Sequence, residues 1–264
     1  MIEARDIEIT FNPGTPMETR ALCGVTLDIP QGEFVTVIGS NGAGKSTFLN
    51  VLAGEALPDA GRISIDGEDV TRLSTDRRAG QVARVFQDPL GGSCADLTIE
   101  ENLALAASRG RQRRLAPALN PIVRDEFRDH ISRLGLGLEN RLGDKMELLS
   151  GGQRQAVSLL MATLRPMKIL LLDEHTAALD PKTAAFVLGL TRDIVAEKHL
   201  TTLMVTHSMR QALDVGTRTV MLHEGRVVLD VAGAQREGLD VPDLLAMFER
   251  VRGEELADDA LLLG

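Results

Sequence analysis

Residues 33–47, EFVTVIGSNGAGKST, run from an apolar segment through a glycine-rich turn into a series of helix formers. From residue 39 the stretch matches the pattern G-x-x-x-x-G-K-[ST], and its place between a predicted buried strand and a predicted helix is the one that a phosphate-binding loop needs. In such a loop the N–H groups of Gly42, Gly44 and Lys45 converge on phosphate oxygens at the positive end of the helix. The Lys45 ammonium adds charge, and the Ser46 hydroxyl can ligate Mg²⁺. The stretch therefore predicts an α/β fold that binds a nucleotide.

A second apolar run, ILLLDE at 169–174, ends in two carboxylates. Parallel sheets present their ligands at the carboxyl ends of the strands, which is where these acids fall. Asp173 suits a metal ligand, directly or through its water shell, and Glu174 can accept a proton from a water that attacks the γ-phosphate. Strands that end in solvated acids are common, so the acids alone leave both interpretations open. Beside the phosphate-binding loop they favour catalysis.

Apolar periodicity organises the rest of the chain into strands and a helical insertion. Segments 168–174 and 201–207, separated by a helical pattern, predict a βαβ unit of a parallel sheet, whereas 2–11 and 24–29 predict an antiparallel pair. From 98 to about 163 the chain has helix formers and no convincing strand, which indicates an inserted helical lobe. The other predicted elements are strands at 62–67 and 82–87, a hairpin around Glu224 and Gly225, and an amphipathic C-terminal helix with an acidic tail.

Composition and charge narrow the class of protein. The 264 residues, 44% of them hydrophobic, suffice for a large core, and Cys23 and Cys94 lack the spacing of a disulfide framework, so we expect free thiols and a reducing compartment. A net charge of −9 argues against nucleic acid as a partner. The N-terminus lacks the apolar core of a secretion signal, and no apolar run is long enough to span a bilayer. We expect a cytosolic protein unless another subunit carries it to a membrane.

A second glycine-rich turn, LLSGGQRQA at 148–156, also opens a predicted helix. Its backbone donors and the Ser150 hydroxyl could bind a phosphate, but it has no lysine and no Mg²⁺ ligand of its own. The chain thus carries two loops suited to phosphate, of which only one is complete.

The segments GSNGAGKST, VFQD, LLSGGQRQ, ILLLDEHTAALD and VTH occur in this order across nearly the whole chain, and together they resemble the ATP-binding subunit of an ABC transporter. LSGGQ is highly specific to that superfamily. The resemblance implies that two copies pack head to tail, with the Ser-Gly-Gly loop of one capping the γ-phosphate held by the other. A heterologous contact repeated by a two-fold axis closes into such a dimer. The resemblance also implies integral-membrane permease subunits, a separate substrate-binding protein and a place on the cytoplasmic face of the inner membrane.

The same resemblance assigns roles to individual residues of this sequence. It implies that Glu174, His207 and Gln87 take part in catalysis, and that Ser46, Gln87 and Asp173 hold Mg²⁺. Asp180 resembles the aspartate that crosses the dimer interface. The residues expected to contact ATP, on their own chain or on the partner's nucleotide, are Phe11, Gly39, Asn41, Gly42, Gly44, Lys45, Ser46, Thr47, Ser150, Gly151, Gly152, Gln153 and Asp180.

Several positions leave two interpretations open. Phe11 lies where the family has an aromatic residue stacked on adenine, but core packing explains a phenylalanine at a strand end equally well, whereas Phe34 is expected in the core. His175 stands where many relatives have proline, so it is either a structural residue or, less simply, a second general base.

Two segments likewise allow a bland and a functional explanation. The segment 87–102, QDPLGGSCADLTIEEN, is either an ordinary surface loop or a coupling surface for a membrane partner. The basic run RGRQRR at 109–114 is better explained as a solvated face than as a phosphate site.

These observations predict one ABC ATPase domain over 1–264, of the α/β P-loop NTPase class, with a parallel core sheet, an antiparallel β flank and an inserted helical lobe. We expect the ATP-binding core at 1–97 and 165–232, the helical lobe with the LSGGQ loop at 98–164, and a C-terminal helix and tail at 233–264. The predicted function is ATP hydrolysis that powers import of a small solute such as an amino acid. The alternative is a soluble ATPase of the same superfamily acting in nucleic-acid work, cofactor assembly or lipid extraction. The nucleic-acid members usually carry coiled-coil insertions or two cassettes, and this sequence has neither.

Overall fold

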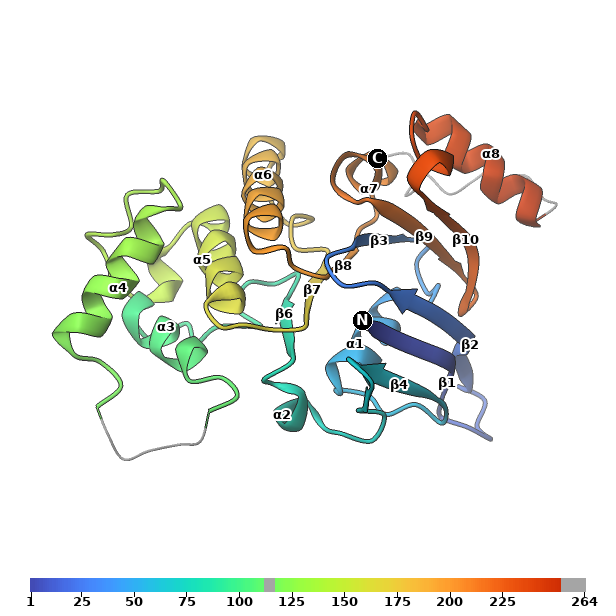
Figure 1. The fold of residues 1–264 in the computed structure, drawn as a ribbon, viewed down its shortest axis with the longest axis horizontal. Helices are drawn as coiled ribbons and strands as arrows, with labels where there is room; N and C mark the ends of the chain where they lie inside the picture. The colour runs from blue at the N-terminus through green and yellow to red at the C-terminus, as the bar shows by residue number, and fades with distance from the viewer. Residues whose placement is uncertain (112–116, 253–264) are drawn as a thin grey trace. The chain divides into compact units, whose positions relative to one another are not determined.

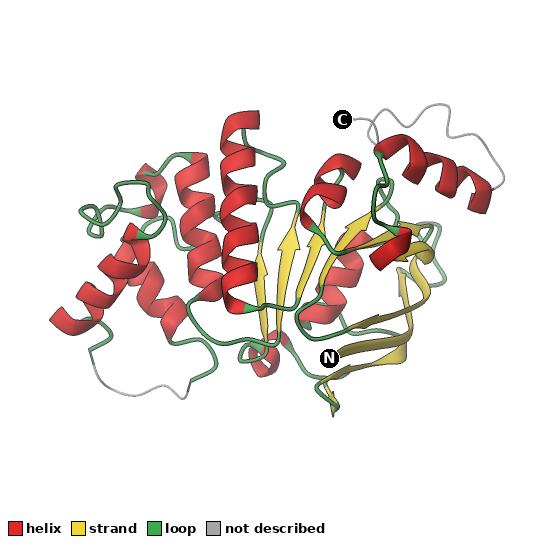
Figure 2. Cartoon of the chain, turned by 45° about the horizontal axis from the view of Figure 1, so that its top comes forward, coloured by secondary structure: helices red, strands yellow, loops and turns green. Residues whose placement is uncertain are grey.

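The computed structural model describes residues 1–111 and 117–252, which fold into two compact units (Figure 1). The first unit combines Met1–Arg78 with the chain from His199 onward, and the second is Ala79–Lys198. Figure 2 distinguishes the strands and helices of both units. Each unit is described on its own.

The first unit contains most of the strands. Its elements are β1 (Ile2–Phe11), β2 (Thr19–Ile29), β3 (Phe34–Ile38), α1 (Lys45–Ala53), β4 (Ala60–Ile65), β5 (Glu68–Asp69), α2 (Thr75–Arg78), β8 (Thr202–Val205), α7 (Met209–Val215), β9 (Arg218–His223), β10 (Arg226–Ala232), the 3₁₀ turn η2 (Gly233–Gln235) and α8 (Val241–Arg252).

An antiparallel sheet of order β2-β1-β4-β5 forms one layer of this unit. β1 pairs with β2 from Ile2 opposite Ile29 to Phe11 opposite Thr19, which confirms the predicted antiparallel pair and extends its second strand toward the N-terminus. One face of β1 is buried through Ile7 and Ile9, as expected for a strand with one face on the core.

The parallel strands of the unit centre on β3, which pairs with β8 on one side and β9 on the other. All five residues of β3 are buried, and a strand covered on both faces reads as a continuous apolar run. β10 turns back antiparallel on β9 through Glu224 and Gly225, whose φ values of 46° and 72° suit a two-residue hairpin turn. The predicted hairpin is therefore confirmed.

A buried arginine fixes the far end of α1. Arg78 is 1% exposed, and its guanidinium donates to the carbonyls of Val51 and Leu52 at 2.7 and 2.8 Å and to those of Leu73 and Thr71. The last carbonyls of a helix have no partner within the helix, and a cation there also opposes the negative end of the helix dipole. Desolvation lowers the pKa of Arg78 to about 10, so it stays charged at neutral pH.

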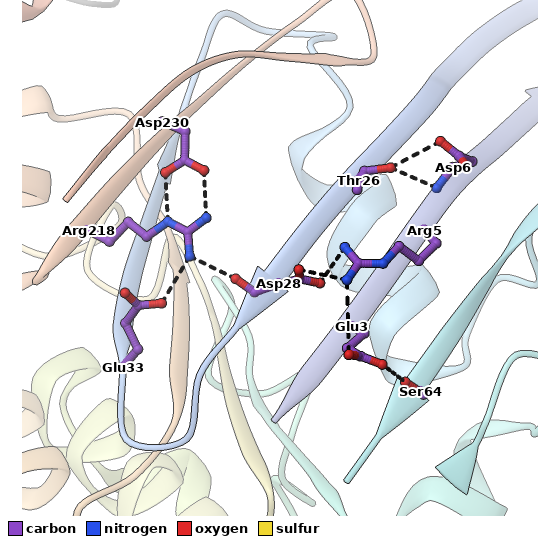
Figure 3. Close-up of polar contacts among 9 residues, drawn as sticks. All are labelled: Glu3, Arg5, Asp6, Thr26, Asp28, Glu33, Ser64, Arg218 and Asp230. Atoms are coloured by element: carbon purple, nitrogen blue, oxygen red, sulfur yellow. Dashed lines mark hydrogen bonds and ion pairs between the residues drawn. The ribbon is translucent and has the colours of Figure 1, made fainter. Parts of the chain in front are cut away.

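Figure 3 shows how charged side chains join the antiparallel sheet to the parallel strands of the first unit. Arg218 on β9 makes a bidentate pair with Asp230 on β10 at 2.6 and 2.5 Å. Its third nitrogen donates to the carbonyl of Asp28 at the end of β2 at 2.7 Å and to Glu33 just before β3 at 3.1 Å. Hydrogen bonding to Asp230 and the nearby carboxylates raise the pKa of Arg218. Within the antiparallel sheet, Arg5 on β1 donates to the side chain of Asp28 on β2 at 2.7 Å.

The second unit is mainly helical. Its elements are β6 (Val82–Val85), α3 (Ile99–Ala107), α4 (Pro121–Ser132), the 3₁₀ turn η1 (Met146–Leu148), α5 (Gly151–Thr163), β7 (Ile169–Asp173) and α6 (Pro181–Lys198). β6 and β7 pair in parallel. An apolar cluster that includes Leu103, Phe127 and Val157 joins α3, α4 and α5.

This unit is larger than the predicted lobe at 98–164, because α5 packs on β6 and α6 as well as on α3 and α4. The described part of 98–164 contains helices and one isolated bridge between Thr98 and Lys145. The assignment of 1–97 and 165–232 to an ATP-binding core, and of 233–264 to a C-terminal helix and tail, stays a prediction. Residues 253–264 of that tail lie outside the described residues.

The C-terminal end of α5 is closed by two cations. Arg109 donates to the carbonyl of Ala162 at 2.9 Å, and Lys198 donates to that of Thr163 at 2.7 Å. Burial lowers the pKa of both side chains. Arg109 is thus part of the packing of its unit, while positions 112–114 of the basic run lie outside the described residues.

None of the helices in the described residues combines the length and the apolar character that crossing a membrane requires. Both cysteines, Cys23 and Cys94, are free.

Candidate nucleotide site

The predicted site residues divide between the two units. The first unit holds Phe11, the loop from Gly39 to Thr47, and His207; the second holds Gln87, Asp173, Glu174, Asp180 and the loop from Ser150 to Gln153.

The glycine-rich loop follows β3 and begins α1 at Lys45, as its pattern predicts. Gly44 caps the helix with φ 98° in the left-handed region, and a Cβ there would lie 2.4 Å from the carbonyl oxygen of Ala21. No other residue fits that position without moving β2. The last turn of the loop is further held by Gly225, whose N–H donates to the carbonyl of Ala43 at 3.1 Å.

Lys45 folds back into this loop. The side chain is 5% exposed, and its ammonium donates to the carbonyls of Gly39 and Ser40 at 2.7 and 3.0 Å. α1 has no side-chain cap hydrogen bond and no acidic residue in its own first turn, so the helix itself supplies no carboxylate to its positive end. Asn41, Gly42 and Ser46 are exposed and Thr47 is half-buried. A buried ammonium beside an exposed Ser46 at the start of a helix is an arrangement suited to an anion such as a phosphate.

Phe11 is the last residue of β1 and is 43% exposed. Core packing does not account for a ring with that much of its surface in solvent. Phe34, by contrast, is 5% exposed in the core, as expected.

His207 follows β8 between two residues with fixed side chains. The Thr206 hydroxyl accepts from the N–H of Ser208 at 3.1 Å and bonds the side chain of Gln211 at 3.0 Å. Ser208 caps α7 by accepting from the N–H of Gln211 at 3.2 Å. These contacts define the backbone on both sides of His207, which is half-buried.

In the second unit, Asp173 ends β7 and is paired with a cation that the sequence analysis did not identify. Arg84 on β6 donates to the Asp173 carboxylate at 2.5 Å, and the two side chains are 9% and 13% exposed. Glu174, the next residue, has φ 44°, an uncommon conformation for a glutamate. Backbone strain of this kind concentrates at functional positions, and here it turns the chain sharply at the strand end.

Gln87 is exposed, and the backbone on both sides of it accepts hydrogen bonds from α5. The amide of Gln155 donates to the carbonyl of Phe86 at 3.2 Å, and the hydroxyl of Ser158 donates to that of Pro89 at 3.3 Å. Both donors lie on the helix that begins at the LSGGQ loop, so the backbone on either side of Gln87 is anchored to that helix.

The LSGGQ loop closes its own helix start with a capping box. The hydroxyl of Ser150 accepts from the N–H of Gln153 at 3.3 Å, and the side-chain oxygen of Gln153 accepts from the N–H of Ser150 at 3.1 Å. The Ser150 hydroxyl hydrogen is not used in this box and can still donate. Ser150 and Gly151 are exposed, but Gly152 is buried.

Close packing against α6 also favours glycine at position 152. A Cβ at this position would lie 2.1 Å from the Thr183 methyl group on α6. At Gly151 the nearest atom is the Leu179 side chain at 3.4 Å, which is ordinary contact. The loop therefore lies against the start of α6, where Asp180 accepts from the N–H of Thr183 at 3.2 Å. Hydrogen bonding from the Thr183 side chain, and then from its backbone N–H, lowers the pKa of Asp180.

His175 is buried at 2% exposure, with its Nε2 3.0 Å from the Thr191 hydroxyl. The hydroxyl donates its one hydrogen to the carbonyl of Val187 at 2.8 Å, so the imidazole must donate through Nε2. Desolvation lowers the pKa of His175 to about 4. A neutral, buried imidazole that donates to a helix residue serves packing rather than proton transfer.

The side chain of Asn102 binds the backbone of the long segment that follows Gln87. Its side chain accepts from the N–H of Cys94 at 2.8 Å and donates to the carbonyls of Cys94, Leu97 and Thr98 at 3.0 to 3.2 Å. Thr98 and Glu101 form a capping box at the start of α3. The segment is thus partly ordered by α3, and its role as a coupling surface stays a prediction.

Three contact residues were missed by motif analysis: Arg84, Gln155 and Asn102. Each carries a polar group within a predicted apolar strand or helix pattern, and such residues are rarely buried without a partner. A polar side chain within an apolar pattern could therefore have identified these three residues as buried contacts, but it does not predict which groups they bind.

Each predicted Mg²⁺ ligand carries the type of oxygen that Mg²⁺ takes beside a nucleotide. Among the described residues, no three His, Cys, Asp or Glu side chains are grouped so as to hold a metal ion by themselves. Mg²⁺ in phosphate sites takes one or two protein oxygens and completes its shell with phosphate and water, so a protein cage is not needed. The oxygens of Ser46, Gln87 and Asp173 are of the required hard type.

Comparison with known proteins identifies the family. A sequence model described as "ABC transporter" matches residues 22–177, more than half of the chain. This chain is an ABC transporter ATP-binding subunit. A tyrosine transport ATP-binding protein of Clostridioides difficile (strain R20291) is 47% identical over 225 residues, covering 85% of this chain and 89% of that protein. The thiamine import ATP-binding protein ThiQ of Escherichia coli (strain K12) is 35% identical and covers 76% and 82%.

Solved structures of ABC cassettes show the same fold. The dimeric structure of MJ0796, a bacterial ABC transporter cassette, has a TM-score of 0.76 and 29% identity, covering 90% of this chain and all of that one. A post-hydrolysis structure of the same cassette, bound to ADP and Pi, gives the same values. The predicted fold class and the predicted ATPase of ABC type are confirmed.

Proposed function

We propose that this ABC subunit hydrolyses ATP to power the import of an amino acid, with tyrosine or a close analogue as the cargo. The relative named for tyrosine transport, at 47% identity over most of both chains, is the observation that carries the proposal. The ThiQ proteins are named for import, which supports the direction, and their lower identity makes thiamine the weaker cargo. The remaining steps concern how the residues would act.

Binding would start at the glycine-rich loop. The Lys45 ammonium would exchange the carbonyls of Gly39 and Ser40 for phosphate oxygens, and the first-turn amides of α1 would donate to the same phosphates. Phe11 would stack on the adenine with the face that it leaves in solvent. Gly39, Asn41, Gly42, Gly44 and Thr47 would line the phosphate chain.

Hydrolysis would transfer the γ-phosphoryl group to water. Glu174 accepts a proton from the attacking water as its oxygen bonds to the γ-phosphorus, the bond to the β-phosphate oxygen breaks, and ADP leaves. His207 donates a hydrogen bond to the γ-phosphate and Gln87 orients the water. Mg²⁺, held by Ser46, Gln87 and Asp173, would supply positive charge to the phosphate oxygens.

The active assembly would contain a second copy of the chain. A cassette 29% identical to this one is known as a dimer, which supports a dimer here. In the head-to-tail arrangement, Ser150, Gly151, Gly152 and Gln153 of one copy would cap the nucleotide of the other, and Asp180 would cross between them. Permease subunits would hold the dimer at the cytoplasmic face of the membrane, and a separate binding protein would deliver the cargo.

Two variants and an uptake assay test this proposal. Lys45→Ala should lose nucleotide binding and hydrolysis, whereas Glu174→Gln should still bind ATP but hydrolyse it about 10²- to 10⁴-fold more slowly. Proteoliposomes that hold the subunit together with its permease and binding-protein partners should then take up labelled tyrosine only with ATP inside and wild-type subunit present. Thiamine uptake without tyrosine uptake would reassign the cargo, and full turnover by Glu174→Gln would remove Glu174 from the mechanism.

A further inference from the structure

Arg84 contacts the Asp173 carboxylate from the neighbouring strand of the same unit. β6 and β7 are parallel, with Arg84 opposite Leu171, so its side chain must extend along the strands to reach Asp173. The nitrogen–oxygen distance is 2.5 Å. The guanidinium also lies over the Phe86 ring, 4.7 Å from its centroid. Two contacts on different sides therefore define the position of the charged group.

Phe86 is itself held by contacts of its backbone and of its ring. The backbone carbonyl accepts a hydrogen bond from Gln155, which is 1% exposed on α5. The ring packs on Gly92, where a Cβ would come within 3.1 Å of the ring edge. Stacking on an aromatic face orients a guanidinium, whose planar group loses little freedom when it is held. Arg84 is thus a rigid arm rather than a mobile surface cation.

Stability alone gives a poor account of this pair. Both side chains are largely buried, at 9% and 13% exposure, and the desolvation of two charges offsets most of their attraction. An apolar pair of similar volume often holds two strands equally well. The feature that an apolar pair could not supply is an oriented carboxylate at the carboxyl end of a parallel strand, where this fold class places its ligands.

We propose that Arg84 is a positioning residue for the metal site: it holds the Asp173 carboxylate in the orientation from which that group binds Mg²⁺ with the nucleotide. The inference rests on the proposed metal role of Asp173. Residues that orient a metal-binding carboxylate typically change metal affinity or activity by about 10- to 100-fold when they are replaced.

The test measures binding, not turnover. The affinity of the full chain for a fluorescent ADP analogue is measured with Mn²⁺ and with EDTA, and the ratio of the two gives the gain that the metal provides. Arg84→Met should lower this gain about tenfold or more and leave the affinity in EDTA unchanged. Arg84→Lys, which keeps the charge but lacks the planar fork, should recover part of the gain.

Controls separate this inference from the proposed function. Arg109→Met removes another partly buried arginine of the same unit, one that closes α5, and should leave the gain at its wild-type value. Asp173→Asn should abolish the gain; if it does not, the proposed metal role of Asp173 fails. If Asp173→Asn abolishes the gain while Arg84→Met leaves or increases it, only the positioning role of Arg84 is overturned. A melting curve of each variant identifies any that do not fold, and Arg84→Lys then carries the comparison.

Discussion

His175 follows the proposed general base directly, yet its surroundings give it a different role. It is 2% exposed, donates to Thr191, and has a pKa lowered by desolvation to about 4. A base that acts near neutral pH needs a pKa closer to that pH and a path to water. These contacts do not support a second general base at this position.

The lowered pKa of His175 predicts how the folded protein responds to acid. Above about pH 6.5 the imidazole is neutral in both folded and unfolded chains, so it contributes no pH dependence. Between about pH 6.5 and 4 the unfolded chain binds a proton that the folded chain does not, so the free energy of unfolding should fall by up to roughly 3 kcal/mol as the pH is lowered.

The variant His175→Gln tests this effect, because it removes the titrating group and keeps a donor for Thr191. Urea unfolding across this range should show a shallower acid loss in the variant, with hydrolysis at neutral pH within about tenfold of wild type. Identical acid slopes, or a far greater loss of hydrolysis, would contradict this assignment.

At the scale of elements, the contact between α5 and α6 accounts for a glycine that the motif alone would assign to phosphate binding. Gly152 lies against the Thr183 methyl group, and a Cβ would approach it to 2.1 Å. Gly152→Ala should therefore destabilise the protein by about 1–3 kcal/mol, the usual range for overpacking a well-packed position. The measurement is the free energy of unfolding in urea.

A second substitution distinguishes packing from any effect on nucleotide. Thr183→Ser removes the methyl group and keeps the hydroxyl, so the double variant Gly152→Ala with Thr183→Ser should regain most of the lost stability. Gly151→Ala serves as the matched control, since its Cβ would meet the Leu179 side chain at an ordinary 3.4 Å. Equal destabilisation at both glycines, or no recovery in the double variant, would show that the Thr183 contact is not the cause.

Local motifs could be predicted from the sequence, but the tertiary contacts of their residues could not. The strand end at Asp173 and the helix starts at Lys45 and Ser150 follow from local patterns, so spacing along the chain was enough to predict them. The strand predicted at 201–207 is shorter than expected, since β8 ends at Val205, two residues before His207. The partner of Asp173 was not predictable in this way. Arg84 is 89 residues away in sequence and reaches it only through the parallel register of β6 and β7.

The packing partner of Gly152 escaped prediction for the same reason. The glycine belongs to a motif that already seemed explained, and Thr183 meets it only because α6 packs beside α5. Local sequence specifies which groups can bind a phosphate or metal, but tertiary register determines which neighbours orient them.

At the scale of the whole molecule, the proposed ATP contacts form two incomplete sets. One set has Lys45 and the exposed Ser46 at the start of α1; the other has Ser150 and Gly151 at the start of α5, with no lysine in its motif. If each nucleotide takes the first set from one copy and the second from its partner, the assembly of two copies completes two sites. Damage to the two sets can then be distributed between chains to test that arrangement.

Mixed dimers give opposite outcomes for sites shared between chains and sites within one chain. Gly151→Asp places a charged side chain where the backbone should approach phosphate, and Lys45→Ala removes the ammonium. In a head-to-tail dimer of one chain of each kind, both lesions fall in one site and the other site is intact. With both chains also carrying Glu174→Gln, so that bound ATP persists, the mixed dimer should trap one ATP, whereas each parent homodimer should trap none. If every site were built within one chain, the mixed dimer would have a lesion in each and would also trap none.

A crosslinking measurement does not depend on whether one intact site can trap ATP alone. In a background without Cys23 and Cys94, Ser150→Cys on one chain and Ser40→Cys on the other should crosslink between chains when ATP is added. A crosslink that forms only within a chain carrying both cysteines would exclude the head-to-tail dimer.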